Sequence, residues 1–170
     1  LSHMRLGTGV GANDAEAVLR ALPNLFLRYR AQDASARALA QWLHTRDEVA
    51  QVLHPALPDS PGHVHWQAVC RPQPNAPEGL AAGIFSVILN AKYTQAQVDR
   101  FCDALQLFRI AYSWGGPISL VVPYGLSALR DLPKPHLAAG RLVRFCIGLE
   151  AVADLQQDIA QALEALKTAT

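Results

Sequence analysis

One arginine stands inside an apolar, strand-like run near the end of the chain. The run from Arg141 to Glu150 reads RLVRFCIGLE, and Arg144 is the guanidinium within it. Charged side chains avoid protein cores unless they are paired, so a polar partner is expected. The planar fork of arginine donors grips a carboxylate at two points. Arg144 is therefore a candidate carboxylate-binding residue, and a structural ion pair is the alternative.

A second stretch, AYSWGGPISL from Ala111 to Leu120, combines a hydroxyl, an indole and two adjacent glycines. We interpret it, together with Arg144, as one half of an active site whose other half is missing from this chain. The alternative is a purely structural role for both residues, with Ser113 as a turn residue and Trp114 as a core aromatic.

Two other patterns are weaker. The glycines from Gly7 to Gly11 could cradle a phosphate, but no strand precedes them and their spacing is wrong, which favours an irregular lead-in. His63 and His65, with His54 upstream, could imitate a metal site. No cysteine or carboxylate lies at a compatible short spacing, so surface or loop-packing histidines are favoured and no metal is expected.

Helical periodicity predicts one long helix or a broken pair of helices from Asp14 to about His44, begun by a capping box of Asn13 and Glu16 and kinked at Pro23. A second capping box, Thr94 and Gln97, begins another helix, and a third helix closes the chain. Strands are predicted at 48–53, 83–89, 109–112, 118–122 and 142–147. The fold class is α/β of the α+β type, with a mixed, mainly antiparallel sheet covered by helices on one face.

Composition excludes several functions. The chain has 170 residues, 51% of them hydrophobic and 17% charged, with a formal net charge of +1. Without a basic run, nucleic acid is not an expected partner, and without a long apolar stretch, neither is a membrane. The three cysteines suit a reduced, cytoplasmic protein better than a disulfide framework.

Five separated motifs carry a resemblance to a known family: NDAEAVLRAL, HPALPDSPGH, GIFSVIL, YSWGG and LVRFCIGLE. In their order and spacing they resemble the C-terminal domain of the Cys/Met-metabolism enzymes that depend on pyridoxal 5'-phosphate (PLP), which have the fold-type I architecture. The YSWGG form resembles the cystathionine β-lyase branch most closely, with cystathionine γ-synthases and methionine γ-lyases as the alternative. The opening Leu1-Ser2-His3-Met4 could be a vector remnant, but its similarity to family sequence favours a native fragment.

The resemblance implies roles for four residues. Arg144 would hold the α-carboxylate of a sulfur amino acid, and Ser113 would lie beside the catalytic lysine and the substrate. Trp114 would line the substrate pocket, and Tyr112 is a weaker candidate for the same lining. Tyr124 and Cys146 are assigned to packing. Where the family usually has Glu and Asp, this chain has Ile118 and Ala151, which affects local packing and helix capping.

The resemblance also implies what this chain lacks. None of Lys92, Lys134 or Lys167 stands in a setting like the family's Ser-x-Thr-Lys, so no catalytic and no cofactor-binding residue is assigned here. We expect residues 1–13 to be a lead-in from a missing N-terminal PLP domain and residues 14–170 to be the C-terminal domain. The parent would be a homo-oligomeric C–S lyase, and the isolated chain would bind no PLP and be inactive. The alternative of another class is a stand-alone, non-catalytic binding or oligomerisation module.

Overall fold

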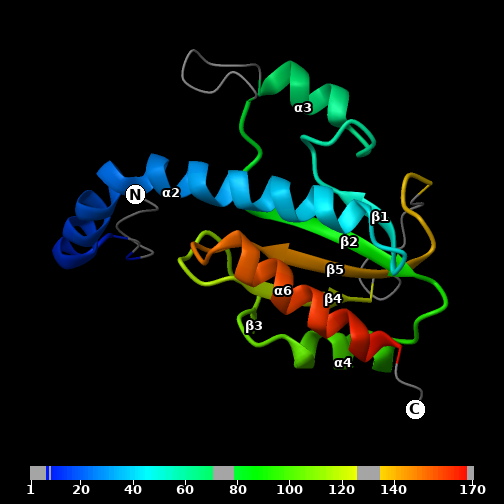
Figure 1. The fold of residues 1–170 in the computed structure, drawn as a ribbon. Helices are drawn as coiled ribbons and strands as arrows, with labels where there is room; N and C mark the ends of the chain where they lie inside the picture. Colours follow the sequence, from blue (N-terminus) through cyan, green and yellow to red (C-terminus); the bar gives the residue numbers. More distant parts are fainter. Residues whose placement is uncertain (1–6, 8, 71–78, 126–134, 168–170) are drawn as a thin grey trace.

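The computed structural model describes residue 7 and residues 9–70, 79–125 and 135–167. The opening residues 1–6 and Lys134, discussed above, lie outside this described part. Helices and strands follow one another as shown in Figure 1. Their bounds are α2 Ala12–His44, β1 Val49–Leu53, α3 His63–Val69, β2 Ile84–Asn90, α4 Gln95–Ala104, β3 Arg109–Ile110, β4 Leu120–Tyr124, β5 Gly140–Cys146, α6 Val152–Leu163 and the 3₁₀ turn η1 Glu164–Leu166.

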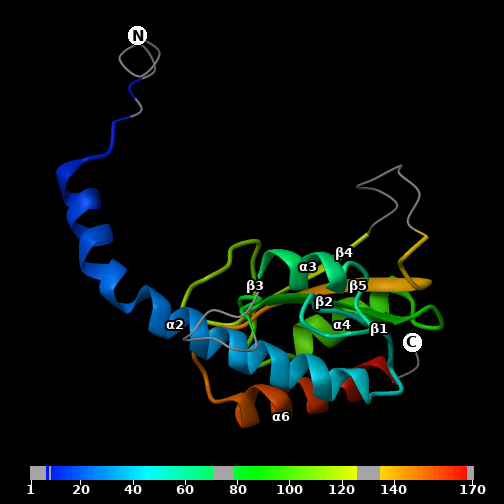
Figure 2. The ribbon, with the colours of Figure 1, turned by 90° about the horizontal axis from the view of Figure 1, so that it is seen from above.

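The strands form one sheet in the order β1-β2-β5-β4-β3. Every neighbouring pair is antiparallel except β3 and β4, which are parallel. Helices α2, α4 and α6 lie on the same side of the sheet (Figure 2). The mixed, mainly antiparallel sheet with helices on one face is therefore confirmed.

Alternation along the strands decides which residues enter the core. Phe85 of β2 and Phe145 of β5 stack with ring centroids 5.5 Å apart, and Phe101 of α4 and Phe108 meet Phe145 edge-on. These aromatic residues are all buried together with the apolar stripe of α6. The helical face of the sheet is thus the core, and the odd-numbered residues of β5 point into it.

The long helix differs from the prediction at its start. It begins at Ala12 with Gly11, in an extended conformation, as N-cap, and no side chain caps it. The predicted capping box of Asn13 and Glu16 is wrong because Asn13 already lies inside the first turn; Glu16 instead pairs with Arg20, whose Nε is 3.1 Å away. Pro23 lies inside the helix, and Figure 2 shows the helix axis bending in its N-terminal half, as predicted.

The two halves of α2 have different surroundings. Its C-terminal half buries Ala36, Leu39, Ala40 and Leu43 in the core. Its N-terminal half projects away from the sheet (Figure 2) and leaves large apolar side chains about half exposed or more: Val18, Leu19, Leu22, Leu25, Phe26 and Leu27. No helix in the described part of the chain is long and apolar enough to cross a bilayer.

Two local features were not predicted correctly. The segment 63–69, for which no element was predicted, forms helix α3, which buries none of its residues and so carries no apolar periodicity in its sequence. The strand predicted at 109–112 is only Arg109–Ile110 and pairs in parallel with Leu120–Val121. The segment 111–119 is therefore a crossover loop between parallel strands, and not a hairpin turn.

Candidate functional site

Arg144 stands on the sheet face opposite the helices. It lies in β5 between Ser86 of β2 and Val122 of β4, which are its cross-strand partners. Its neighbours Val143 and Phe145 are fully buried in the helical core, so the pleat sends the Arg144 side chain to the other face. A charge on that face avoids the desolvation that the core would impose.

The guanidinium of Arg144 is held by the backbone of the crossover loop 111–119. Its Nη2 donates to the carbonyl oxygens of Tyr112 at 2.9 Å, Ser113 at 3.3 Å and Ala111 at 3.5 Å. Its Nε is buried and has no hydrogen-bond partner among the described residues. An unsatisfied buried donor is costly, so an acceptor for this N–H is expected beyond the described residues.

The middle of the loop 111–119 is fastened to three parts of the fold. Gln32 of α2 donates from Nε2 to the Gly116 carbonyl at 2.8 Å, and the Leu149 amide donates to the Pro117 carbonyl at 2.8 Å. The Gly115 amide points to Cys146 Sγ at 3.4 Å. Gly115 has a φ of +72°, which glycine adopts without strain. The loop is therefore a fixed platform for Arg144.

A buried polar clamp closes the C-terminal end of the loop. The carboxylate of Glu150 accepts from the Ser119 amide at 2.7 Å and from the Ser119 hydroxyl at 2.8 Å, while the Gly148 amide donates to Ser119 Oγ at 2.9 Å. Ser119 is fully buried. Gly148 has to be glycine, because a Cβ there would lie 2.4 Å from the Pro117 carbonyl oxygen.

At two positions near the clamp this chain departs from the usual family residue. Ile118, the first of them, is exposed and takes no part in the clamp. The other departure has the expected effect, because Ala151 begins α6 without a side-chain cap.

The predicted site residues do meet in space, although about thirty residues separate them in sequence. The hydrogen bonds from Arg144 to Tyr112 and Ser113 confirm this proximity. Ser113 contacts Arg144 through its carbonyl and not through its hydroxyl. Tyr112 and Trp114 are 70% and 65% exposed, so the alternative of Trp114 as a core aromatic is wrong. The substrate-binding roles of all four residues stay predictions.

Trp114 also lines a small cavity beside the loop. Its walls include Tyr29 and Gln32 of α2, Gly83, Gly115 and Cys146. Burial raises the pKa of the Cys146 thiol above its ordinary value, although the Gly115 amide and the Arg144 charge oppose the rise. Cys146 is therefore a neutral wall of this cavity, consistent with the packing role predicted for it.

Sequence reasoning missed Tyr124 as a neighbour of the site. Its ring lies under the guanidinium, with Arg144 Cζ 5.8 Å from the ring centroid, and meets the Tyr112 ring edge-on at 6.2 Å. Only the register of β4 against β5 places it there, since Val122 faces Arg144 and Tyr124 follows two residues later on the same face. No local pattern in the sequence carries that register.

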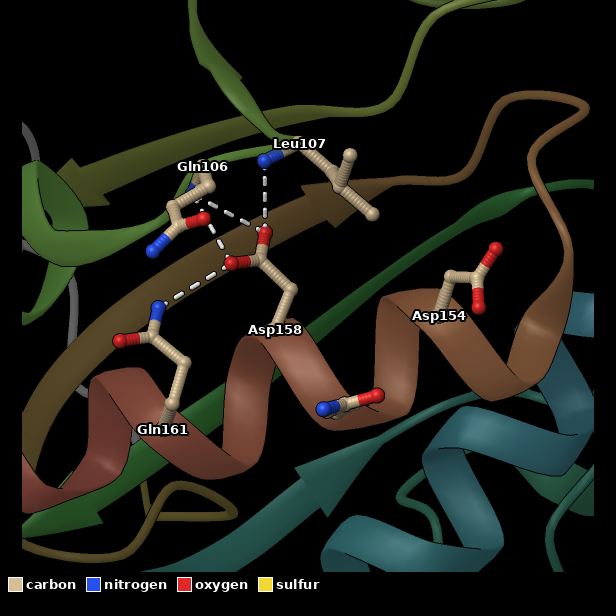
Figure 3. A pocket seen from close by; sticks show the side chains of 6 residues that line it. Gln106, Leu107, Asp154, Asp158 and Gln161 are labelled. Atoms are coloured by element: carbon tan, nitrogen blue, oxygen red, sulfur yellow. Dashed lines mark hydrogen bonds between the residues drawn. The ribbon is translucent and has the colours of Figure 1, made fainter.

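A second polar cluster among the described residues serves the fold. Figure 3 shows a groove at α6 where the Asp158 carboxylate accepts from the Gln106 and Leu107 amides, both at 2.8 Å, and from Gln161 Nε2 at 3.1 Å. Asp158 thus anchors the segment that leads into β3.

The histidines also serve the fold. His54 is fully buried and accepts from the Ala56 amide at 3.2 Å, and the His63 ring contacts the Pro55 carbonyl at 2.8 Å. No group of three metal-binding side chains occurs among the described residues.

The described residues do not provide a lysine for the aldehyde of PLP. The ammonium group of Lys92 lies 5.0 Å from the Tyr93 ring centroid. That of Lys167 pairs with Glu48 at 3.2 Å and Glu164 at 2.7 Å. Neither contact involves Arg144 or the loop 111–119. The donors of Arg144 are of the kind that suits a carboxylate, and neither described lysine contacts the candidate site.

Comparison with known proteins indicates the family of this chain. A cystathionine β-lyase of Salmonella typhimurium is 37% identical over 158 residues, which cover 91% of this chain and 38% of that protein. Among solved structures, an O-acetylhomoserine sulfhydrylase of Wolinella succinogenes is 28% identical with a TM-score of 0.74, over 95% of this chain and 41% of that one. CalE6, a methionine γ-lyase of Micromonospora echinospora, is 30% identical with a TM-score of 0.73, over 95% and 40% respectively.

This chain therefore spans about two fifths of the length of the proteins it matches. The sequence model of the Cys/Met metabolism PLP-dependent enzymes matches residues 1–164. That match includes the loop 111–119, Arg144 and the Ser119–Glu150 clamp. The chain belongs to the family of Cys/Met metabolism PLP-dependent enzymes.

Proposed function

We propose that this chain is the substrate-carboxylate-binding part of a PLP-dependent carbon–sulfur lyase that cleaves cystathionine by β-elimination. The observation that carries the proposal is the Arg144 guanidinium, held through Nη2 by three backbone carbonyls while its buried Nε has no partner among the described residues. An amino-acid carboxylate is the planar, anionic acceptor that such a donor suits.

The chain's own residues bind and orient, and the rest of the reaction belongs to the parent. The carboxylate held at Arg144 would fix the substrate relative to the 111–119 platform, and Trp114 and Tyr112 would flank the remainder. Fixing a reactant in one orientation lowers the entropic part of the barrier. The overall reaction would turn cystathionine and water into homocysteine, pyruvate and ammonia.

A second candidate within the family is γ-elimination or γ-replacement, as in methionine γ-lyases or cystathionine γ-synthases. The structural likeness to a methionine γ-lyase and to an O-acetylhomoserine sulfhydrylase supports this second candidate. The Trp114 of the YSWGG motif and the similarity to a cystathionine β-lyase favour β-elimination.

The parent would supply the PLP-bearing part, and the exposed half of α2 is a surface that suits its packing. Leu22, Leu25, Phe26 and Tyr29 line an apolar hollow there. Tyr29 also borders the Trp114 cavity, so a domain packed against the hollow would reach the candidate site. A contiguous exposed apolar patch of this kind marks an interaction site. We further propose that the parent is a homo-oligomer.

The test is an assay of the full-length gene product, purified with PLP. Supplied separately with cystathionine, methionine and O-acetylhomoserine, it should release pyruvate and a thiol from cystathionine with the highest kcat/KM. Release of a four-carbon keto acid from methionine at a higher kcat/KM would favour the γ-lyase candidate. A gene product of the length of this chain alone, with no turnover, would instead support the non-catalytic module.

A further inference from the structure

We infer that Tyr124 is a positioning residue for Arg144: the Tyr124 ring fixes the plane of the guanidinium and hence the direction of the N–H donors that have no partner among the described residues. The inference rests on the proposed function, because it concerns how the carboxylate-binding arginine is aimed. It adds to that function a residue outside both sequence stretches that predicted the site.

The three residues Arg144, Tyr124 and Tyr112 form a closed set of contacts. The Tyr124 ring lies 5.8 Å from Arg144 Cζ, within the range of a cation–π interaction. The Tyr112 ring braces Tyr124 at 6.2 Å and an interplanar angle of 65°, an edge-to-face geometry. The Tyr112 carbonyl accepts from Arg144 Nη2 at 2.9 Å, which closes the triangle.

The sheet itself explains why Tyr124 reaches Arg144. Val122 is the direct cross-strand partner of Arg144, and Tyr124 is paired with Leu142. Tyr124 is therefore the diagonal neighbour of Arg144 on the same face, at a spacing that long and aromatic side chains bridge. Val122, being small and buried, leaves the guanidinium free to turn unless something flat lies against it.

The backbone bonds alone do not fix that orientation. All three carbonyl contacts meet the same atom, Nη2, so the guanidinium can pivot about it. A ring against the face of the guanidinium prevents the pivot and blocks approach of a ligand over that face. A carboxylate is then directed to the edge of the guanidinium and away from its face.

The kinetic experiment uses the full-length gene product with cystathionine and compares Tyr124→Leu with Tyr124→Phe. Loss of the ring should raise KM about 3- to 10-fold and change kcat less than about twofold, whereas Phe keeps the ring and should stay within about twofold in both. In an Arg144→Lys background, Tyr124→Leu should change KM less than about twofold, because its effect acts through the arginine.

The matched control is Trp66→Leu, which removes a ring from another arginine. Trp66 of α3 lies 5.4 Å from Arg37 Cζ and has no contact with Arg144. KM should not change in this variant. An unchanged KM in Tyr124→Leu, an equal effect of Phe and Leu, or an equal effect of Leu with Lys at position 144 would overturn the inference.

A second readout does not depend on turnover. In the 170-residue chain labelled with ¹⁵N-arginine, the Nε–H resonance of Arg144 is the one that disappears in Arg144→Lys. This resonance should shift when Tyr124 is replaced by Leu, because the ring current is lost. It should shift much less when Tyr124 is replaced by Phe. An unmoved resonance would refute the contact. Were the gene product to turn over no sulfur amino acid, the proposed function would fail, and this resonance would still decide on Tyr124.

Discussion

Glu150 and Ser119 are joined by two hydrogen bonds to one carboxylate, at 2.7 Å from the Ser119 amide and 2.8 Å from its hydroxyl. This pair connects the end of the crossover loop to the segment that follows β5. The loop provides the carbonyls at one end of the site, and β5 provides Arg144. The clamp therefore holds together the two stretches that form the site.

Replacement of Glu150 by Ala should lower the free energy of unfolding by about 1–3 kcal/mol, because two donors of the buried Ser119 lose their acceptor. Chemical denaturation of the purified chain measures the loss. Glu164→Ala is the control, since Glu164 is exposed and pairs with Lys167 at the surface. Equal stability of the two variants would show that the clamp contributes nothing.

Arg144→Lys in the full-length gene product keeps the charge and loses the fork of donors. We expect kcat/KM to fall by about 30- to 150-fold, the equivalent of about 2–3 kcal/mol for a charge-assisted bond in a desolvated site. Part of the loss should appear in kcat, because the carboxylate also orients the reacting bonds. PLP content should stay unchanged. A change within about twofold in kcat/KM would make Arg144 a structural residue.

The isolated chain should be folded and inactive. Its core is closed by its own helices and strands, while its described lysines contact Tyr93, Glu48 and Glu164. Circular dichroism should show a cooperative unfolding transition. After incubation with PLP and gel filtration, the protein fraction should have no PLP absorbance. A stable absorbance band, or release of pyruvate from cystathionine by this chain alone, would contradict the expectation.

His54 should make the fold sensitive to acid. Burial, and secondarily the charge of Arg37, lowers the pKa of His54 to about 4 in the folded chain, against an ordinary value of 6.5. The folded state keeps the ring neutral and the unfolded state protonates it, so stability is unaffected above pH 6.5 and falls as the pH drops toward 4. The total loss from this residue is about 3 kcal/mol.

The measurement is the unfolding free energy between pH 4 and pH 7. His54→Leu should be less stable at pH 7, because the Ala56 amide loses its acceptor, but should have a flatter profile below pH 6.5. The exposed His65→Leu serves as the reference and should retain the slope of the unmodified chain. A slope that persists in His54→Leu would assign the acid sensitivity to other groups.

The sequence predicted what depends on local chemistry. The capping box of Thr94 and Gln97 is present at the start of α4, since it needs only residues three apart. The strands at β2 and β5 follow from β-branched and aromatic runs, and Arg144 was conspicuous because a charge interrupts such a run. The proximity of Arg144 to Ser113 came from recognising both motifs.

Structural features that depend on strand register, or on the absence of a covering partner, were not predicted from the sequence. Tyr124 became part of the site only because β4 is aligned against β5, and no residue near it in sequence signals that alignment. The parallel pairing of the short β3 could not be read from two residues. The periodicity that predicted α2 also could not show that the face bearing Leu22 and Phe26 is uncovered, since an apolar stripe looks the same with or without a partner.

Helix α2 has a mechanical consequence. It is continuous from Ala12 to His44, with one end packed in the core and the other end projecting from it, and Gln32 lies between those halves. Through the hydrogen bond from Gln32 to the Gly116 carbonyl, the helix contacts the loop that holds Arg144. Pro23 lies between the projecting end and Gln32, so the bend of the helix stands on the path along which a displacement of that end would reach the arginine.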